Sequence, residues 1–231
     1  FNERVRYSET DEHEQATILS VVNYLQDCST FHSTEVGLTV DYLREMKRAW
    51  LLSYWDIYIE RMPKLCERLT IGTCPHAFRG VLAHRNFWIK DEAGAYILRA
   101  DSLWFCYDTE RMRPAKITED MLTPFGEMRD VLALPASERK ITEPEVLTEA
   151  APIIVQPHHA QYIASADEVL TEAAGGKERF HAGRIRAEYR KAAVLGDTML
   201  PKYGSSPDGG LIVSLQSHAG DVYCNVEFIR S

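Results

Sequence analysis

The sequence predicts an α+β fold made of two similar copies, each an antiparallel sheet wrapped around one central helix. Three observations support this prediction. Each half of the chain contains one long segment whose apolar residues recur at helical spacing. In each half, that segment precedes several segments with a period of two, rich in Ile, Val, Tyr, Phe and Trp. The same order of elements therefore occurs twice, which is typical of an internal duplication.

The first half opens with a short strand expected at 5–7 and an acidic turn at 8–14, before a long helix at 17–30. A shorter helix is expected at 41–47. The period then changes to two, with prolines or the Gly-containing turn at 91–94 between the segments. The strands expected in this half cover residues 49–61, 69–73, 80–90 and 96–107.

The second half repeats this order in shorter form, with a strand expected at 153–156 and a helix at 161–170. Its final hairpin turns at 217–220, which contains Ala-Gly like the turn of the first half. The other strands expected in this half cover residues 183–190, 198–203, 211–216 and 221–229.

This organisation corresponds to a double (tandem) hotdog fold. We assign residues 1–108 to the N-terminal copy and residues 152–231 to the C-terminal copy. Residues 109–151, through which prolines recur, are interpreted as the linker. A linker of this length is long for a plain loop, so we expect it to contain short helices, for example at 121–132.

Composition limits the function. The chain of 231 residues has a formal net charge of −8, which argues against general nucleic-acid binding because that function rests on a basic surface. No run approaches the roughly 20 apolar residues of a membrane span, and residues 1–6 contain no signal-peptide core. We therefore expect a cytoplasmic protein. The five cysteines are too scattered for a metal pattern, so we expect neither a metal nor a cofactor.

The strand-to-helix junction of the second half is unusually short. Helices normally follow a Ser, Thr, Asp or Asn cap, but residues 157–160 read Pro-His-His-Ala. The internal repeat provides a ruler for this junction. Tyr24 lies 19 positions after Val5, whereas Tyr162 lies only 7 positions after Val155. If the two tyrosines correspond, the second copy lacks about a dozen residues here.

Several short segments also follow one another in a characteristic order along nearly the whole chain. They are Val5-Arg-Tyr-Ser-Glu-Thr-Asp11, Tyr24-Leu-Gln-Asp-Cys-Ser-Thr-Phe-His32, Arg48-Ala-Trp50, Ser53-Tyr-Trp55, Arg85-Asn-Phe87, Asp101-Ser-Leu-Trp104, Ala187-Glu-Tyr-Arg-Lys191 and Leu195-Gly-Asp197. In order and spacing these segments resemble the bacterial acyl-ACP thioesterase family.

The resemblance implies a tandem hotdog enzyme that hydrolyses the thioester between a fatty acyl chain and the phosphopantetheine arm of acyl carrier protein, ending chain elongation. Acyl carrier protein would be the partner, and a homodimer is left open. The reaction needs an activated water, stabilisation of the oxyanion and a dry groove for the acyl chain. By resemblance, the second copy is the catalytic half and the first copy houses the acyl chain.

The family's catalytic signature is Asp-x-Asn-x-His-Val-Asn-Asn, followed by a helix that begins Gln/Lys-Tyr-Ile. Here His158-His159 and Gln161-Tyr-Ile163 match its flanks, but the main Asp, Asn and His are absent between His159 and Gln161. This gap coincides with the shortfall that the internal repeat measures. We therefore predict that about nine residues of the native protein are missing from this sequence at that point.

The two adjacent histidines are candidates for a supporting catalytic role beside the absent residues. His159 is the better candidate because it lies nearer to the signature. The alternative is a pair of strand-end histidines bonded to nearby backbone, since adjacent strand residues point to opposite faces. Plant members carry an acidic residue and a cysteine at positions that hold Ala192 and Ala193 here, so neither of those groups can supply the chemistry.

The resemblance also implies two binding surfaces. Aromatic residues would line the acyl pocket, although such residues are more often sheet core. Basic residues of the second copy would dock the acidic carrier protein, with ordinary solvated charges as the alternative. The candidates for the acyl pocket are Trp50, Tyr54, Trp55, Phe87 and Trp104, and those for the carrier-protein face are Arg184, Arg186, Arg190 and Lys191.

Two further pairs invite a catalytic interpretation. Cys28 and His32 lie four positions apart on a predicted helix, but cysteines mostly serve as small buried hydrophobes. Asp11 and His13 occupy the first-copy place that corresponds to the catalytic segment, but helix capping also explains an acidic turn. Two other functions stay open: an acyl-CoA thioesterase, and a non-catalytic acyl-binding hotdog protein that lacks the active-site segment.

Overall fold

The computed structural model describes residues 1–128, 131–155, 158–176, 180–207 and 209–230. The chain forms two compact units, and each is described separately below. The first unit comprises Phe1–Ala16, Ser20–Ser53 and Met62–Pro135, and the second comprises Thr17–Leu19, Tyr54–Arg61 and Ala136–Ser231.

The first unit contains nearly all of the long helix α1 (Ile18–Glu35) and the short helix α2 (Val40–Glu45). The apolar residues of α1 recur at helical spacing, so that Val22 and Leu25 lie on one fully buried face. Helix α2 begins after Thr39, whose side chain accepts a hydrogen bond from a backbone N–H of the first turn.

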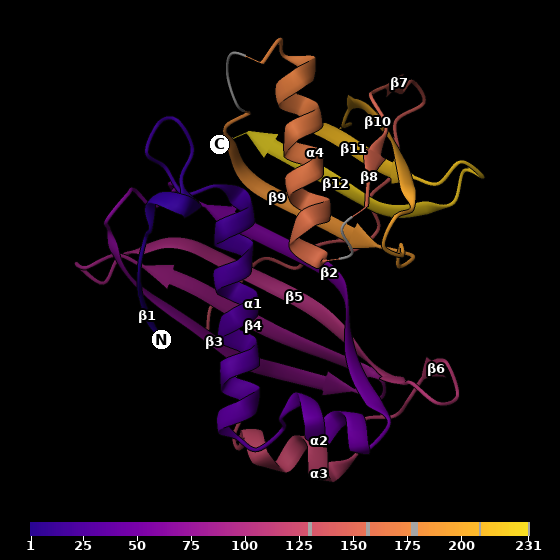
Figure 1. Ribbon diagram of the computed structural model, residues 1–231. Coiled ribbons are helices and arrows are strands. Elements are labelled where there is room, and N and C mark those ends of the chain that lie inside the picture. Colours follow the sequence, from indigo (N-terminus) through magenta and orange to yellow (C-terminus); the bar gives the residue numbers. More distant parts are fainter. Residues whose placement is uncertain (129–130, 156–157, 177–179, 208, 231) are drawn as a thin grey trace. The chain divides into compact units, whose positions relative to one another are not determined.

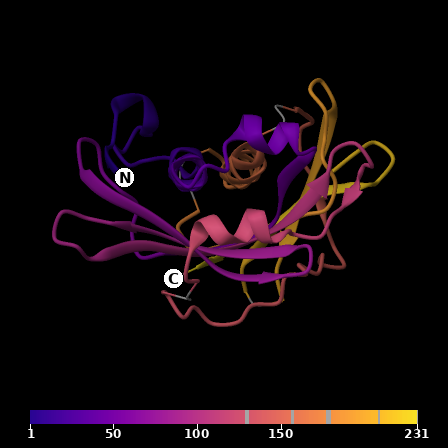
Figure 2. The ribbon, with the colours of Figure 1, turned by 90° about the horizontal axis from the view of Figure 1, so that it is seen from below.

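The strands of the first unit form an antiparallel sheet. They are β1 (Asn2–Arg4), the first part of β2 (Arg48–Ile59), β3 (Arg68–Arg79), β4 (Leu82–Lys90), β5 (Tyr96–Asp108) and β6 (Arg113–Pro114). Strand β1 pairs with β3, β3 with β4, β4 with β5, and β5 with β6. Figure 1 shows α1 lying across β3, β4 and β5, and in Figure 2 these strands pass on one side of α1.

Strand β3 contains a bulge at His76. Pro75 lies opposite Arg85 of β4, whereas Ala77 lies opposite His84, so His76 is the extra residue of the pair. Proline has no N–H to donate to the ladder, which explains why the regular pairing is interrupted next to Pro75. The bulge lets the strand continue beyond the proline.

The second unit packs helix α4 (His159–Ala173) against a second antiparallel sheet, as Figure 1 shows. Residues 54–58 of β2 pair with the first strand of this sheet. The buried face of α4, which includes Ile163, Val169 and Leu170, contacts the sheet. The strands are β7 (Thr148–Glu149), β8 (Ile153–Ile154), β9 (Ala182–Tyr189), β10 (Thr198–Ser205), β11 (Leu211–Gln216) and β12 (Val222–Arg230). From β2 the order is β9, β12, β11, β10 and β7, with β8 also paired to β10.

The strand predicted at 5–7 is wrong in its position. Strand β1 is at Asn2–Arg4, and Tyr7–Glu9 form a 3₁₀ turn, η1. The Glu9 carboxylate accepts a hydrogen bond from the backbone N–H of Arg6 at 2.7 Å. This local bond turns the chain and ends its extended course, because it offers the backbone an alternative partner to the ladder.

The linker helix predicted at 121–132 is also wrong in its extent. Helix α3 (Glu119–Leu122) is one turn long and is followed directly by the 3₁₀ turn η2 (Thr123–Phe125). Gly126, with φ 67°, takes the chain out of the helical region. Pro124 has no backbone N–H, so the hydrogen-bond ladder of α3 cannot continue through it. Residues 129–130 lie outside the described part of the chain.

The other predicted helices and strands are present with shifted bounds. The largest shift is in β3, predicted at 69–73, which continues past Pro75 by means of the bulge. Residue 156 of the strand predicted at 153–156 lies outside the described residues.

The two compact units divide between Pro135 and Ala136, and β2 contributes to both of them. The duplication bounds 1–108, 109–151 and 152–231 therefore stay a prediction. Among the helices in the described part of the chain, none combines the length and apolar character needed to cross a membrane.

Candidate active site

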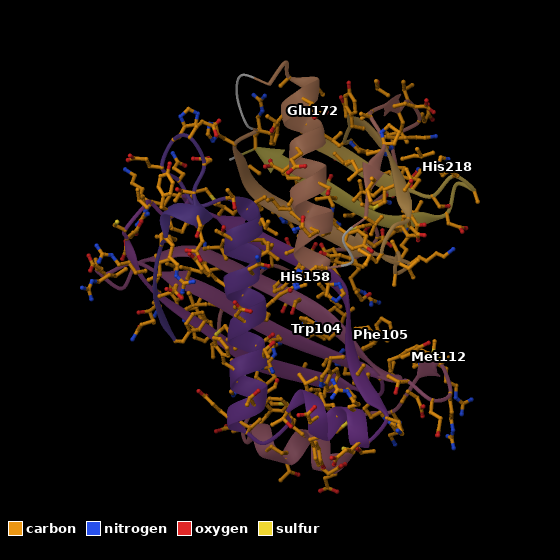
Figure 3. All side chains as sticks on the ribbon, viewed as in Figure 1. Trp104, Phe105, Met112, His158, Glu172 and His218 are labelled. Atoms are coloured by element: carbon orange, nitrogen blue, oxygen red, sulfur yellow. The ribbon has the colours of Figure 1, made fainter. Side chains whose placement is uncertain are left out.

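The candidate site begins at the first turn of α4. The helix starts at His159, and His158 is its N-cap residue with extended backbone (φ −134°, ψ 136°) and no capping hydrogen bond from its side chain. Figure 3 labels His158 at this end of α4. The first N–H groups of a helix have no partners within it and carry partial positive charge. An uncapped start of this kind can donate hydrogen bonds to an oxyanion.

His159 is held by the end of β9. The hydroxyl of Tyr189 donates a hydrogen bond to the His159 carbonyl at 2.8 Å, and the two rings meet edge to face with centroids 5.5 Å apart. Burial, with a smaller effect of His158, lowers the pKa of His159 to about 4. The imidazole is therefore neutral at pH 7. A base with so low a pKa removes protons weakly, so the chemistry of His159 fits orientation by hydrogen bonding better than proton abstraction.

Two tyrosines connect α4 to β9. The ring of Tyr162 meets the ring of Tyr189 edge to face at 5.7 Å, and its hydroxyl accepts a hydrogen bond from the N–H of Ala193 at 3.0 Å. The sequence reasoning missed both as site residues, although Tyr162 follows Gln161 and Tyr189 follows Glu188 in segments that carry the resemblance. Ala193 is buried, and only its backbone is polar at this position.

Two of the residues predicted to bind the carrier protein, both on β9, form ion pairs with carboxylates of this chain. Arg184 donates two hydrogen bonds of 2.8 Å to the two oxygens of Asp56 on β2. Arg186 is buried, with donors to Glu227, to the Tyr54 hydroxyl and to the Glu138 carbonyl. Arg186 is therefore buried and paired, and Arg184, whose side chain is 28% exposed, has its charge compensated by Asp56.

Arg190 and Lys191 remain accessible. Their side chains are 35% and 56% exposed, and they pair with Glu188 at 3.1 Å and with Asp221 at 2.6 Å. Hydrogen bonding to Asp221 raises the pKa of Lys191, so its charge persists. Exposed pairs of this kind are weak and can exchange partners.

The predicted acyl-pocket residues do not form one group. Trp50 and Trp104 pack against the same apolar cluster of the first unit. Phe87 is fully buried in that unit, while Trp55 is fully buried in the second. Tyr54 lies next to Trp55 on β2 and uses its hydroxyl to bind Arg186 and Ser137. The buried members of the apolar cluster are Leu43, Ala83, Cys106, Ile117 and Met121.

Neither of the two alternative pairs forms a catalytic arrangement. The Cys28 thiol donates to the Ile71 carbonyl at 3.6 Å, and burial raises its pKa, so it is not a thiolate. His32 instead meets Arg85, with Nδ1 to Nη1 at 3.1 Å.

Asp11 serves the turn that precedes α1. Its carboxylate accepts hydrogen bonds from the backbone N–H groups of His13 and Gln15 at 2.9 and 3.0 Å. This is the structural role that capping chemistry predicts for an acidic turn.

The family model of the acyl-ACP thioesterase N-terminal domain matches residues 2–125, which is more than half of the chain. The chain belongs to the acyl-ACP thioesterase family. The oleoyl-acyl carrier protein thioesterase of Coriandrum sativum, a chloroplastic protein, is 26% identical over 124 residues. That match covers 51% of this chain and 34% of the relative, so the chain spans about a third of the length of this curated relative.

Solved structures extend the likeness of fold to nearly the whole chain. A protein of Lactobacillus plantarum, described provisionally as an oleoyl thioesterase, has a TM-score of 0.85 at 20% identity, covering 99% of this chain and 93% of its own. An acyl-ACP thioesterase of Bacteroides thetaiotaomicron has a TM-score of 0.84 at 18% identity, with 99% and 96% covered. The 12:0-ACP thioesterase of Umbellularia californica has 0.81 at 15%, with 99% and 95% covered. These likenesses confirm the predicted double hotdog fold.

The junction before α4 is where this chain departs from the family signature. Between Val155 and Gln161 the chain has only Gln, Pro, two His and Ala, and residues 156–157 lie outside the described structure. The main Asp, Asn and His therefore have no counterpart between His159 and Gln161. The absence of about nine native residues at this point stays a prediction.

Proposed function

We propose that the protein hydrolyses the thioester of fatty acyl-[acyl carrier protein], releasing a free fatty acid and ending elongation. The observation that carries this proposal is the family match over residues 2–125 together with the double hotdog fold of the whole chain. In this reaction water adds to the thioester carbonyl, and the phosphopantetheine thiol leaves with a proton.

We propose that the start of α4 holds the thioester. The partial positive charge at this helix N-terminus would stabilise the negative charge that develops on the carbonyl oxygen. The neutral His159, oriented by Tyr189, would support the site by hydrogen bonding, with its low pKa keeping it uncharged. The water-activating Asp, Asn and His would come from the segment predicted between His159 and Gln161.

Trp50 and Trp104 are the residues that we propose to line the pocket for the acyl chain. Both border an apolar cluster under α2 and α3, and both are only partly buried, so their rings can meet a ligand. The indole N–H of Trp104 donates to the Ser102 hydroxyl at 2.7 Å, which leaves the apolar part of the ring for contact. We do not assign Tyr54, Trp55 and Phe87 to this pocket, because Trp55 and Phe87 are fully buried and the Tyr54 hydroxyl accepts a hydrogen bond from Arg186.

For the carrier protein, the proposed face is reduced to Arg190 and Lys191. Acyl carrier protein is acidic by the family resemblance, and exposed cations raise its association rate in a salt-dependent way. We propose a cytoplasmic location, in keeping with this partner, and the homodimer stays open.

The test is release of free fatty acid from acyl carrier proteins loaded with chains of different length, using the product of the complete gene. Acyl-CoA of the same chain length, added as competitor, separates the acyl-CoA thioesterase alternative. Replacing both Arg190 and Lys191 with Glu should weaken binding of acyl carrier protein and leave acyl-CoA hydrolysis unchanged. Arg44→Glu is the matched charge control, because Arg44 is an exposed cation of the first unit.

One observation favours a second function. The sequence between His159 and Gln161 contains no catalytic Asp, Asn or His. If the complete gene also lacks them, the protein is a non-catalytic hotdog that binds acyl chains. Acyl-chain binding without fatty-acid release would then replace the proposed hydrolysis.

A further inference from the structure

Three possible metal ligands lie together on one face of the first unit. They belong to neighbouring strands: His76 to β3, His84 to β4 and Asp101 to β5. Asp101 is directly opposite Asn86, which lies two residues from His84 and so shares its face. The bulge at His76 puts its side chain beside His84, with ring centroids 5.5 Å apart.

The distances among these groups match those within a small metal site. His76 Nε2 lies 2.7 Å from one oxygen of Asp101, and His84 Nδ1 lies 3.6 Å from the other. All three candidate ligand atoms lie within 4.8 Å of one another. Tetrahedral ligands at normal Zn²⁺ bond lengths lie about 3.3 Å apart, so shifts of a few tenths of an ångström to about one ångström would centre an ion.

We propose that His76, His84 and Asp101 bind a divalent transition-metal ion, with Zn²⁺ as the best match. Two imidazoles and one carboxylate are a ligand set that suits Zn²⁺ and its neighbours in the first row. Ca²⁺ and Mg²⁺ prefer oxygen ligands, so two imidazoles disfavour them. A fourth position would be filled by water.

The surroundings favour an occupied site. The side chains of His76, His84 and Asp101 are 14%, 31% and 28% exposed, which leaves a path for an ion to enter. The amide of Asn86 donates to Asp101 Oδ1 at 3.4 Å and accepts from the N–H of Val131 at 3.2 Å. An outer partner of this kind fixes the orientation of a ligating carboxylate.

This site is separate from the proposed thioester site. It uses only residues of the first unit, on the face of β4 opposite to that of Arg85, which contacts His32 of α1. Its expected effect is to tie three strands together. The sequence reasoning missed it because the ligands are 8 and 17 positions apart, and only the sheet register with its bulge brings them together.

The test is titration of the chelator-treated full chain with Zn²⁺ by calorimetry, and with Co²⁺ by its visible absorption bands. We expect one ion per chain, with Co²⁺ bands typical of nitrogen and oxygen ligands. At Zn²⁺ concentrations about 100 times Kd, the Tm should rise by about 5–10 °C.

Asp101→Asn and His84→Gln should each weaken Zn²⁺ binding by more than the roughly 10–100-fold typical of outer-shell changes. Both keep side-chain size, and the Tm of each variant without metal tests its folding. His218→Ala is the matched control, because His218 is exposed in the turn between β11 and β12, where Figure 3 labels it. Cys66→Ser tests the exposed thiol. Binding that survives in both ligand variants, disappears with Cys66→Ser, or is absent from the unaltered chain would overturn the proposal.

Discussion

Helices α1 and α4 are the long helices of the two copies, but they begin in different ways. Before α1, Asp11 accepts two backbone hydrogen bonds, and the Tyr24 hydroxyl of α1 donates to Glu9. Before α4 no comparable turn exists in the sequence, and Tyr162 accepts a hydrogen bond from Ala193 instead.

The difference indicates what each start is for. Asp11 and Glu9 before α1 are bonded within the turn or to the helix, so they stabilise structure. The start of α4 keeps backbone donors without a side-chain cap and a neutral His159 beside them. A helix start that is costly to leave uncapped is a reasonable place for a ligand.

The largest expected effect comes from the absent segment. Inserting the family's Asp-x-Asn-x-His-Val-Asn-Asn between His159 and Gln161 should raise acyl-ACP hydrolysis by roughly 10²–10⁴-fold, the usual contribution of a general base. The same insertion with Ala in place of its Asp and His is the control. Sequencing the gene across this junction checks the prediction independently, and a gene that encodes the sequence as printed would contradict it.

The pH dependence of stability should differ between the two helix starts. The folded state keeps the pKa of His159 at about 4, below the usual 6.5, so its contribution is present above pH 6.5 and lost as pH falls toward 4. The loss should be at most about 3 kcal/mol. Urea unfolding at several pH values measures it, and His159→Gln should flatten this part of the profile.

His13→Gln, in the turn before α1, is the control for that experiment because His13 is exposed. It should leave the profile unchanged between pH 6.5 and 4. If the free energy of unfolding of His159→Gln depends on pH just as that of the unaltered chain does, then the titration of His159 does not contribute to stability.

Removing the Asp11 carboxylate from the turn before α1 should change stability and leave activity unchanged. Asp11→Ala loses two hydrogen bonds from backbone N–H groups, so the free energy of unfolding should fall by about 1–2 kcal/mol. Asp11→Asn keeps the accepting oxygen and should recover most of this loss. Rates of acyl-ACP hydrolysis should be equal in both variants, and a rate that falls with Asp11→Ala would give this turn a part in the chemistry.

The smallest effect is expected from Tyr189→Phe. It removes the hydrogen bond to the His159 carbonyl but keeps the ring contact, which should cost about 1 kcal/mol in the free energy of unfolding. In the catalytically complete protein it should also lower kcat while leaving KM for acyl-ACP nearly unchanged. Tyr203→Phe is a control on β10 of the same unit.

Period and composition were enough to predict the double hotdog fold. The helical spacing of α1 and α4 and the alternation along β2 to β5 and β9 to β12 are local signals, so single segments reveal them. The 3₁₀ turn at Tyr7–Glu9 and the short α3 were missed because one side-chain bond or one glycine decides them.

The site was predicted less well because its residues depend on partners distant in sequence. From the sequence Arg184 is expected to be an exposed cation. Its ion-pair partner Asp56 lies 128 positions away, so no local pattern reveals the pair. Tyr54 and Trp55 are adjacent on β2 and point to opposite faces, so they could not line one pocket. The repeat supplied an internal standard for length that drew attention to His159 and the junction, and both stay predictions.

Strand β2 belongs to both compact units. It gives residues up to Ser53 to the first unit and residues from Tyr54 to the second, where Asp56 anchors Arg184. A break in the linker would thus release a C-terminal fragment without the strand that β9 pairs with. The two compact units therefore share one strand, and neither unit contains the whole of β2.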